Sequence, residues 1–208
     1  MARYTGPVCK LCRREQTKLF LKGDKCYTKC VLDKRPTPPG PAKSMRSKPS
    51  TYSVRLREKQ KLRRMTFMTE KPFARFLDIA TKTKGASGLA LLRLLDLRLD
   101  NVIRRAGFAT SLRTARQLAL HGHVKLQGRT ARTPSALLDP GDVVTLDSGV
   151  KENVGVKLSL ETAKRLNNRP AFLEVDEEKL SVKVLRVPER DEMSWPVNEL
   201  LIIEYYSR

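Results

Sequence analysis

The chain contains no apolar run close to twenty residues and no hydrophobic signal core after Met1. A helix that spans a bilayer needs about 20 apolar residues, and a secretory signal needs an apolar core near the start of the chain. We therefore expect a protein without a membrane span that stays in the compartment where it is made. Aromatic residues are also scarce, at 6%. Because a membrane-surface helix needs aromatic anchors, we expect no membrane partner.

Acidic residues are too few to balance the basic ones. The 208 residues include 42 Lys and Arg against 22 Asp and Glu, which gives a net charge of +20. Residues 1–65 hold 19 of these cations and only 4 acids. So strong an excess of positive charge favours a polyanionic partner, and nucleic acid is the expected one. The first third of the chain should supply most of the electrostatic attraction.

No cysteine occurs after residue 30, and all four lie in the first segment as Cys9, Cys12, Cys26 and Cys30. A chain that stays where it is made keeps its thiols reduced, so disulfides are not expected. Two close pairs separated by thirteen residues are typical of a four-cysteine knuckle that holds one tetrahedral zinc ion. An iron–sulfur cluster uses the same four thiolates, and four unliganded thiols in a flexible arm are the third interpretation.

Residues 1–48 form a basic, loop-rich arm that ends in a proline strap. Four prolines between residues 36 and 41 exclude a helix and favour a stiff, extended chain. The strap is either a plain linker or a segment that lies over RNA. The cations of the arm that we expect to contact RNA are Arg13, Arg14, Lys34, Arg35, Lys43, Arg46 and Lys48.

A helix is predicted over residues 53–65, with Val54, Leu62 and Met65 on one side. It carries six cations on the flanks of that stripe. A solvated charged face is the ordinary explanation, but with the global charge excess we favour phosphate contacts. Glu58 is expected to pair with Arg55 or Lys61. The six are Arg55, Arg57, Lys59, Lys61, Arg63 and Arg64.

Two further helices should follow, one capped by Thr69 and ending near Gly85, the other apolar and buried over residues 87–97. Late in the chain, Ser159 is expected to cap a short helix that ends at Asn167, and residues 172–175 and 182–187 to form strands. The apolar C-terminal segment, residues 196–208, should pack back on the helical domain because exposed apolar termini are unfavourable.

The most informative stretch is residues 97–147. It predicts a helix over 99–106 that Gly107 ends, and a second helix that Ser111 caps. Alternation at Val124 and Leu126 indicates a half-buried strand, which is followed by turns at residues 127–128 and 139–142 and a strand over 143–146. On pattern alone this is a small α+β module with a basic face. The cations and histidines that we expect to contact RNA here are Arg104, Arg105, Arg113, Arg116, His121, His123 and Lys125.

The string RLDNVI, AGF, TARQLALHGHVKL, GR, PS and PGD within this stretch resembles the RNA-binding module named after small-subunit ribosomal protein four. RYTGPVCKLCRRE near the start, YSVRLREKQKLRR in the middle and PVNELLIIEYYSR at the end extend the likeness over almost the whole chain. The sequence is therefore identified as a member of that ribosomal protein family, in its bacterial or organellar form.

We accordingly predict an α+β fold. A cysteine-bearing arm, residues 1–48, precedes a mostly helical domain, residues 49–97, which segment 188–208 completes. The RNA-binding domain, residues 98–187, has residues 98–147 as its core module of two helices and a short antiparallel sheet.

The resemblance implies a structural, early-assembling protein of the small ribosomal subunit. It implies binding to a helix junction in the 5′ domain of small-subunit rRNA. It also implies a place at the channel through which mRNA enters, beside ribosomal proteins three and five, with an influence on decoding accuracy. The protein would reside in cytoplasmic ribosomes, or in the matrix or stroma if its source is an organelle.

Catalytic constellations are weak or missing. Arg98-Leu99-Asp100 resembles the triplet of pseudouridine synthases, which can carry the same module, but the chain lacks a second large domain to build the cleft. His121 and His123 could be half of a metal site, yet no carboxylate or third histidine stands at ligand spacing. We see no phosphate-binding loop and no Ser/His/Asp set. We expect no enzyme, the alternatives being an RNA-modifying enzyme or a non-ribosomal RNA binder with the same module.

Overall fold

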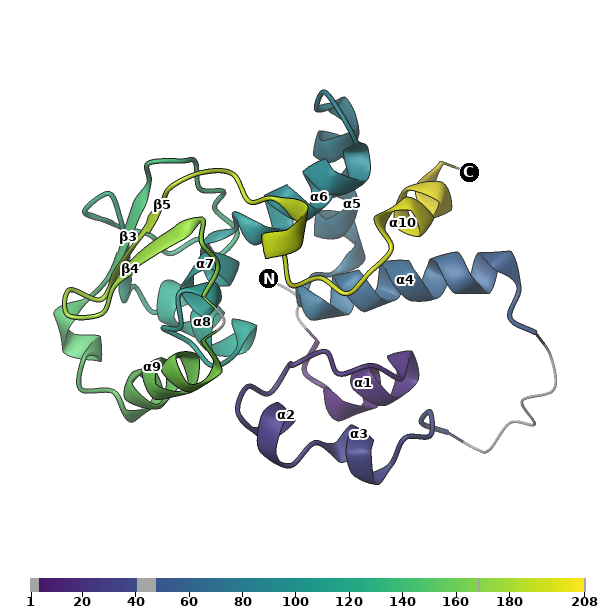
Figure 1. The fold of residues 1–208 in the computed structure, drawn as a ribbon, viewed down its shortest axis with the longest axis horizontal. Helices are drawn as coiled ribbons and strands as arrows, with labels where there is room; N and C mark the ends of the chain where they lie inside the picture. The colour runs from purple at the N-terminus through teal and green to yellow at the C-terminus, as the bar shows by residue number, and fades with distance from the viewer. Residues whose placement is uncertain (1–3, 41–47, 168, 208) are drawn as a thin grey trace. The chain divides into compact units, whose positions relative to one another are not determined.

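The computed structural model describes residues 4–40, 48–167 and 169–207. The chain forms two compact units, one made of residues 1–91 and 195–208, the other of residues 92–194. Both are drawn in Figure 1. Within the described residues, no helix is both long and apolar enough to cross a membrane.

The first unit is helical. In the arm, α1 (Cys9–Glu15), α2 (Lys25–Thr28) and α3 (Val31–Lys34) are short. The long basic helix α4 (Thr51–Met65) begins where Ser50 Oγ accepts a hydrogen bond of 3.2 Å from the Ser53 N–H, which is the ordinary role of an N-cap serine. α5 (Glu70–Lys82) follows, and α6 (Ser87–Asp96) passes from the first unit into the second. Thr69 holds the N-cap position of α5 as predicted, but its side chain makes no capping hydrogen bond.

The C-terminal helix α10 (Glu199–Tyr206) packs on α4, as Figure 1 shows. Ile202 is fully buried, and the Phe73 ring of α5 lies 6.4 Å from that of Tyr206. At the first residue of α10, Glu199, Gly88 of α6 comes so close that a Cβ on this glycine would lie 2.7 Å from the Glu199 Cγ. The prediction that the apolar C-terminus packs on the helical domain is confirmed.

The second unit combines helices with one antiparallel sheet. α7 (Leu99–Arg105) and α8 (Leu112–Leu120) precede β1 (Val124–Leu126), β2 (Arg129–Thr130) and β3 (Val143–Leu146). β4 (Leu173–Asp176) and β5 (Ser181–Val184) complete the sheet, in the order β2-β1-β3-β5-β4. A single hydrophobic core joins both helices to the sheet, with Ile103, Phe108, Val144 and Phe172 fully buried.

Local turn chemistry explains most of these boundaries. Gly107 adopts a φ of +90° directly after α7, and Ser111 Oγ accepts a hydrogen bond of 3.3 Å from the Thr114 N–H at the start of α8. Gln127 and Gly128 both have positive φ, which suits the two-residue turn of a hairpin. Helix α7 has no side-chain cap; instead its first N–H groups donate to the carbonyl oxygens of Pro134 and Ala136. The loop that contains Pro134 and Ala136 therefore caps α7, although it lies far from this helix in the sequence.

The prediction for residues 159–167 is wrong at its start. Helix α9 runs from Val154 to Leu166, and its cap is Asn153, whose Oδ1 accepts a hydrogen bond of 2.8 Å from the Gly155 N–H. Ser159 is instead buried in the middle of the helix. The predicted end is right, because Asn167 takes the left-handed conformation that ends a helix. Two 3-10 turns, Ser148–Val150 and Arg190–Glu192, complete the unit. The α+β fold class is confirmed.

Candidate nucleic-acid interface

The six cations of α4 all form ion pairs inside the first unit. Lys61 pairs with Glu58 at 3.5 Å, as predicted for one of these cations. The other pairs are Arg55 with Glu204 at 2.7 Å, Arg57 and Arg64 with Glu15, Lys59 with Glu70 at 2.8 Å, and Arg63 with Glu70 at 3.6 Å. One acid each from α1, α5, α10 and α4 itself therefore fixes the side chains of a helix that the sequence marks only as basic.

Lys59 is the most enclosed of the six. Its side chain is 4% exposed, and its ammonium group lies 4.6 Å from the centre of the Tyr205 ring. Glu70 also accepts a hydrogen bond from the Tyr206 hydroxyl. Burial alone would raise the pKa of Glu70, but the hydrogen bonds from Lys59 and Tyr206 lower it below its usual value. Lys59 thus fastens α4, α5 and α10 together, and its burial leaves little of it for RNA.

Glu15 is the acid that two α4 arginines share. Its side chain is 2% exposed, and its Oε1 accepts hydrogen bonds from Nη1 of both Arg57 and Arg64. Burial raises the pKa of Glu15, and the two arginines act in the opposite direction. Desolvation likewise lowers the pKa of Arg64.

In the second unit, a buried ion pair stands where α7 begins. Arg98 donates two hydrogen bonds to Asp100, of 3.0 and 2.8 Å, and both side chains are at most 3% exposed. Arg116 of α8 donates to the same carboxylate at 3.4 Å. Arg113, from the same helix, is exposed. The capping Ser111 therefore starts a helix on which one arginine is anchored to Asp100 and another faces solvent.

The turn after α8 carries the predicted histidines. His121 is exposed, and its ring lies 6.2 Å from that of His123. Lys125 on β1 pairs with Asp147 at 3.1 Å. The sequence reasoning missed two exposed arginines on the β1–β2 hairpin side of this turn, Arg129 and Arg132. The Nε atom of Arg132 lies 3.3 Å from where a Cβ on Gly122 would stand. Arg129 directly follows the turn glycine Gly128, and that position was the available signal for it.

Arg105 faces inward. It donates to Ser194 Oγ at 2.6 Å and also to the Glu192 carbonyl. Burial lowers the pKa of this guanidinium. Arg104 is also half-buried, with its Nε enclosed. These placements indicate a structural role for Arg105 in holding the segment that leads out of the unit.

Most of the described cations of the arm are exposed. Arg13 is an exception, because its Nε donates to the Thr37 carbonyl at 2.9 Å and its Nη2 to that of Pro38 at 3.4 Å. This ties the proline strap to α1. Of the arm cations predicted to contact RNA, Arg14, Lys34, Arg35 and Lys48 are exposed, whereas Lys43 and Arg46 lie outside the described residues.

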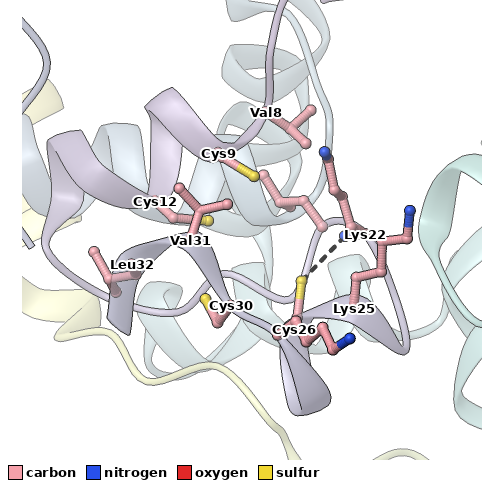
Figure 2. A pocket seen from close by; sticks show the side chains of 11 residues that line it. Val8, Cys9, Cys12, Lys22, Lys25, Cys26, Cys30, Val31 and Leu32 are labelled. Carbon is pink, nitrogen blue, oxygen red and sulfur yellow. Dashed lines mark hydrogen bonds between the residues drawn. The ribbon is translucent and has the colours of Figure 1, made fainter. Parts of the chain in front are cut away.

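The four cysteines line one pocket between α1, α2 and α3, and Figure 2 shows their thiols directed into a common space. The Lys22 N–H donates to Cys26 Sγ at 3.4 Å, and such a bond stabilises a thiolate. Burial nevertheless raises the pKa of the Cys12 and Cys26 thiols. Among the described residues, no three His, Cys, Asp or Glu side chains are close enough together to hold an ion. The donor set fits zinc in its chemistry, although the sulfurs are not gathered around one point.

Comparison with known proteins covers the whole chain. Residues 3–96 match the family described as Ribosomal protein S4/S9 N-terminal domain, and residues 97–144 match the S4 domain. The chain is 49% identical over 209 residues to "Small ribosomal subunit protein uS4A" of Symbiobacterium thermophilum, with 100% of both chains covered. It is 46% identical to "Small ribosomal subunit protein uS4" of Halothermothrix orenii and 47% to that of Thermus thermophilus, again over 100% of each chain.

Proposed function

The chain belongs to the uS4 family of small ribosomal subunit proteins, and we propose that it binds the helix junction in the 5′ domain of small-subunit rRNA and nucleates assembly there. Members of this family are structural components of the ribosome and not enzymes, so the protein acts through binding. Full-length similarity to ribosomal relatives sets aside a non-ribosomal RNA binder and an RNA-modifying enzyme. The protein is accordingly associated with ribosomes.

The observation that carries the rRNA proposal is the surface around the α8 turn. Exposed Arg113, His121, Arg129 and Arg132 come from the helix, the turn and the hairpin that the module brings together. RNA helices are read through backbone shape and phosphate contacts more than through base edges. Side-chain hydrogen-bond donors on three elements suit that mode, because the fold holds them at a spacing that a folded RNA can match.

A binding measurement tests this proposal. The full-length protein is titrated with a transcript of the rRNA 5′ domain and with an unrelated structured RNA of equal length, over a series of salt concentrations. We expect tighter binding to the 5′ domain at every salt concentration and a steep loss of affinity with salt. Equal affinity for the two RNAs would contradict the proposal, because counterion release alone is indifferent to sequence and shape.

We propose that part of the arm faces the mRNA. We also propose that the protein lies beside ribosomal proteins three and five in the small subunit, where it influences decoding accuracy. Extended cations contact single strands through phosphates without sequence preference, and Lys48 is exposed next to α4. We expect Arg46→Ala with Lys48→Ala to spare assembly and to slow translation of messages with downstream hairpins. A double variant that fails to enter subunits but reads hairpins normally would assign both residues to rRNA anchoring.

We also propose that Cys9, Cys12, Cys26 and Cys30 bind zinc, with an iron–sulfur cluster as the alternative. The support is the shared pocket and the N–H that donates to the Cys26 sulfur. A structural metal would supply cross-links that a short, loop-rich arm lacks. Elemental analysis of protein purified with and without oxygen tests this. Stoichiometric zinc is expected, and absence of both zinc and iron in the anaerobic sample would refute it.

A further inference from the structure

Glu15 is an acid placed where a strongly basic protein should avoid one. It is the last residue of α1, three positions after the buried Cys12, and its side chain is 2% exposed. A carboxylate so deeply buried is unfavourable unless it is paired and hydrogen-bonded. Its partners therefore indicate what the residue is for.

Both partners lie on α4 and use the same oxygen. Arg57 donates through Nη1 to Glu15 Oε1 at 3.3 Å, and Arg64 donates through its own Nη1 to that atom at closer range. The two arginines are seven residues apart, two turns along one face of the helix. One carboxylate thus draws two guanidinium groups together that would otherwise repel each other.

The contact with Glu15 does not occupy all the N–H donors of the two arginines. Their side chains are 32% and 18% exposed. A guanidinium carries five N–H donors, and within the described part of the chain Arg57 and Arg64 donate hydrogen bonds through Nη1 alone. Most donors of each group are therefore left for another acceptor, and two cations facing one anion keep a local excess of positive charge.

We propose that Glu15 is a positioning residue that holds Arg57 and Arg64 as a preorganised pair for an rRNA phosphate. The inference rests on the proposed rRNA-binding function and names a residue through which it works. Long arginine side chains lose much rotamer freedom when they bind, and a side chain that is already fixed loses less. Because Glu15 belongs to α1, the pair also connects the cysteine-bearing arm with α4.

The sign of one substitution separates this idea from simple electrostatics. Glu15→Gln raises the net charge by one, and charge alone then predicts tighter binding to RNA. If Glu15 positions the arginines, affinity should fall instead. Asp78→Asn is the matched control, because it makes the same charge change at an exposed acid of α5 in the same unit.

The experiment measures dissociation constants of the full-length variants for the rRNA 5′-domain transcript at one salt concentration, with thermal melts to check folding. We expect Glu15→Gln to weaken binding by about three- to tenfold, the range for one lost hydrogen bond of ordinary strength. Asp78→Asn should bind as the wild type does or slightly tighter. In a background with Arg57→Gln and Arg64→Gln, Glu15→Gln should cause no further loss.

A second substitution keeps the test decisive if Glu15→Gln does not fold. Glu15→Asp retains the charge and shortens the side chain by one methylene, so only positioning is impaired. We expect weaker binding, and unchanged affinity would overturn the proposal, as would tighter binding by Glu15→Gln that matches Asp78→Asn. If the wild type itself does not prefer the 5′ domain, the proposed function fails. If it does and both Glu15 variants bind equally well, only the role of Glu15 fails.

Discussion

Replacing Asp100 by Asn should destabilise the second unit severely, because the carboxylate holds a buried arginine. Arg98 is 3% exposed and Asp100 is 1% exposed, and two hydrogen bonds of 3.0 and 2.8 Å join them. In Asp100→Asn one oxygen becomes an NH2 group that faces guanidinium N–H donors, so one contact is lost and a donor meets a donor. Breaking a buried ion pair at one partner costs about 3–5 kcal/mol.

The expected change in melting temperature follows from that free energy. For a domain of about 100 residues, each kcal/mol shifts the melting temperature by roughly 4–8 °C, so a loss of about 3 kcal/mol corresponds to roughly 12–24 °C. Thermal unfolding followed by circular dichroism measures the shift. Asp147→Asn is a control, since that side chain is 43% exposed and its ion pair with Lys125 lies at the surface; a shift of a few degrees at most is expected there.

A second variant tests the mechanism itself. Arg98→Met combined with Asp100→Leu replaces both charges with apolar groups of similar size, and such exchanges are often neutral or stabilising. We expect the double variant to be clearly more stable than Asp100→Asn. The reasoning is refuted if Asp100→Asn melts as the wild type does, or if the double variant is as unstable as the single one. The same geometry gives Asp100 a structural role, because Arg98 and Arg116 donate hydrogen bonds to its oxygens and its side chain is 1% exposed.

Three further outcomes are expected. Arg113→Ala should weaken binding to the rRNA 5′ domain by about 1–2 kcal/mol in a filter-binding assay with only a small change in melting temperature, since interactions of an exposed arginine contribute little to stability. Ile202→Ala should lower the free energy of unfolding of the first unit by about 2–5 kcal/mol in urea titrations, because it opens a cavity under α10. The lowered pKa of Glu70 contributes stability that is present above its unfolded pKa and is lost as pH falls through the folded one, so the melting-temperature advantage of the wild type over Glu70→Gln should be largest above the unfolded pKa and shrink as pH falls, as a pH series of melts of both proteins would show.

Local sequence signals were sufficient wherever one residue decides the backbone. Ser111 and Gly107 fix the ends of α8 and α7 through a cap and a positive φ, and both were predicted correctly. The same rule misled at Ser159, because a serine in the middle of an amphipathic helix and a serine at its cap look alike in sequence. Asn153, six residues earlier, was the better cap, and only the packing of Val156 against the core distinguishes the two.

Pairing between distant segments could not be predicted in the same way. The sequence places Lys59 among five other cations and gives no sign that Glu70 and Tyr205 enclose it. Glu70 lies 11 positions further along the chain, and Tyr205 belongs to the C-terminal helix. A charge excess identifies the kind of ligand, but which cations remain for it depends on where the few acids are placed.

The acids of the first unit therefore carry more information about binding than its cations do. Glu204 pairs with Arg55, Glu70 with Lys59, and Glu15 with Arg57 and Arg64. The first two belong to the packing of α10 and α5 on α4, where the lysine is buried and its charge serves the fold. Glu15 differs because its own side chain is 2% exposed, against 48% for Glu204 and 46% for Glu70, while its two arginines remain partly exposed. An acid that leaves its cations exposed makes them a fixed site for phosphate, whereas an acid that buries its cation removes it from the interface. On this argument, substituting acids should map the RNA-binding face of α4 more sharply than substituting its six cations one by one.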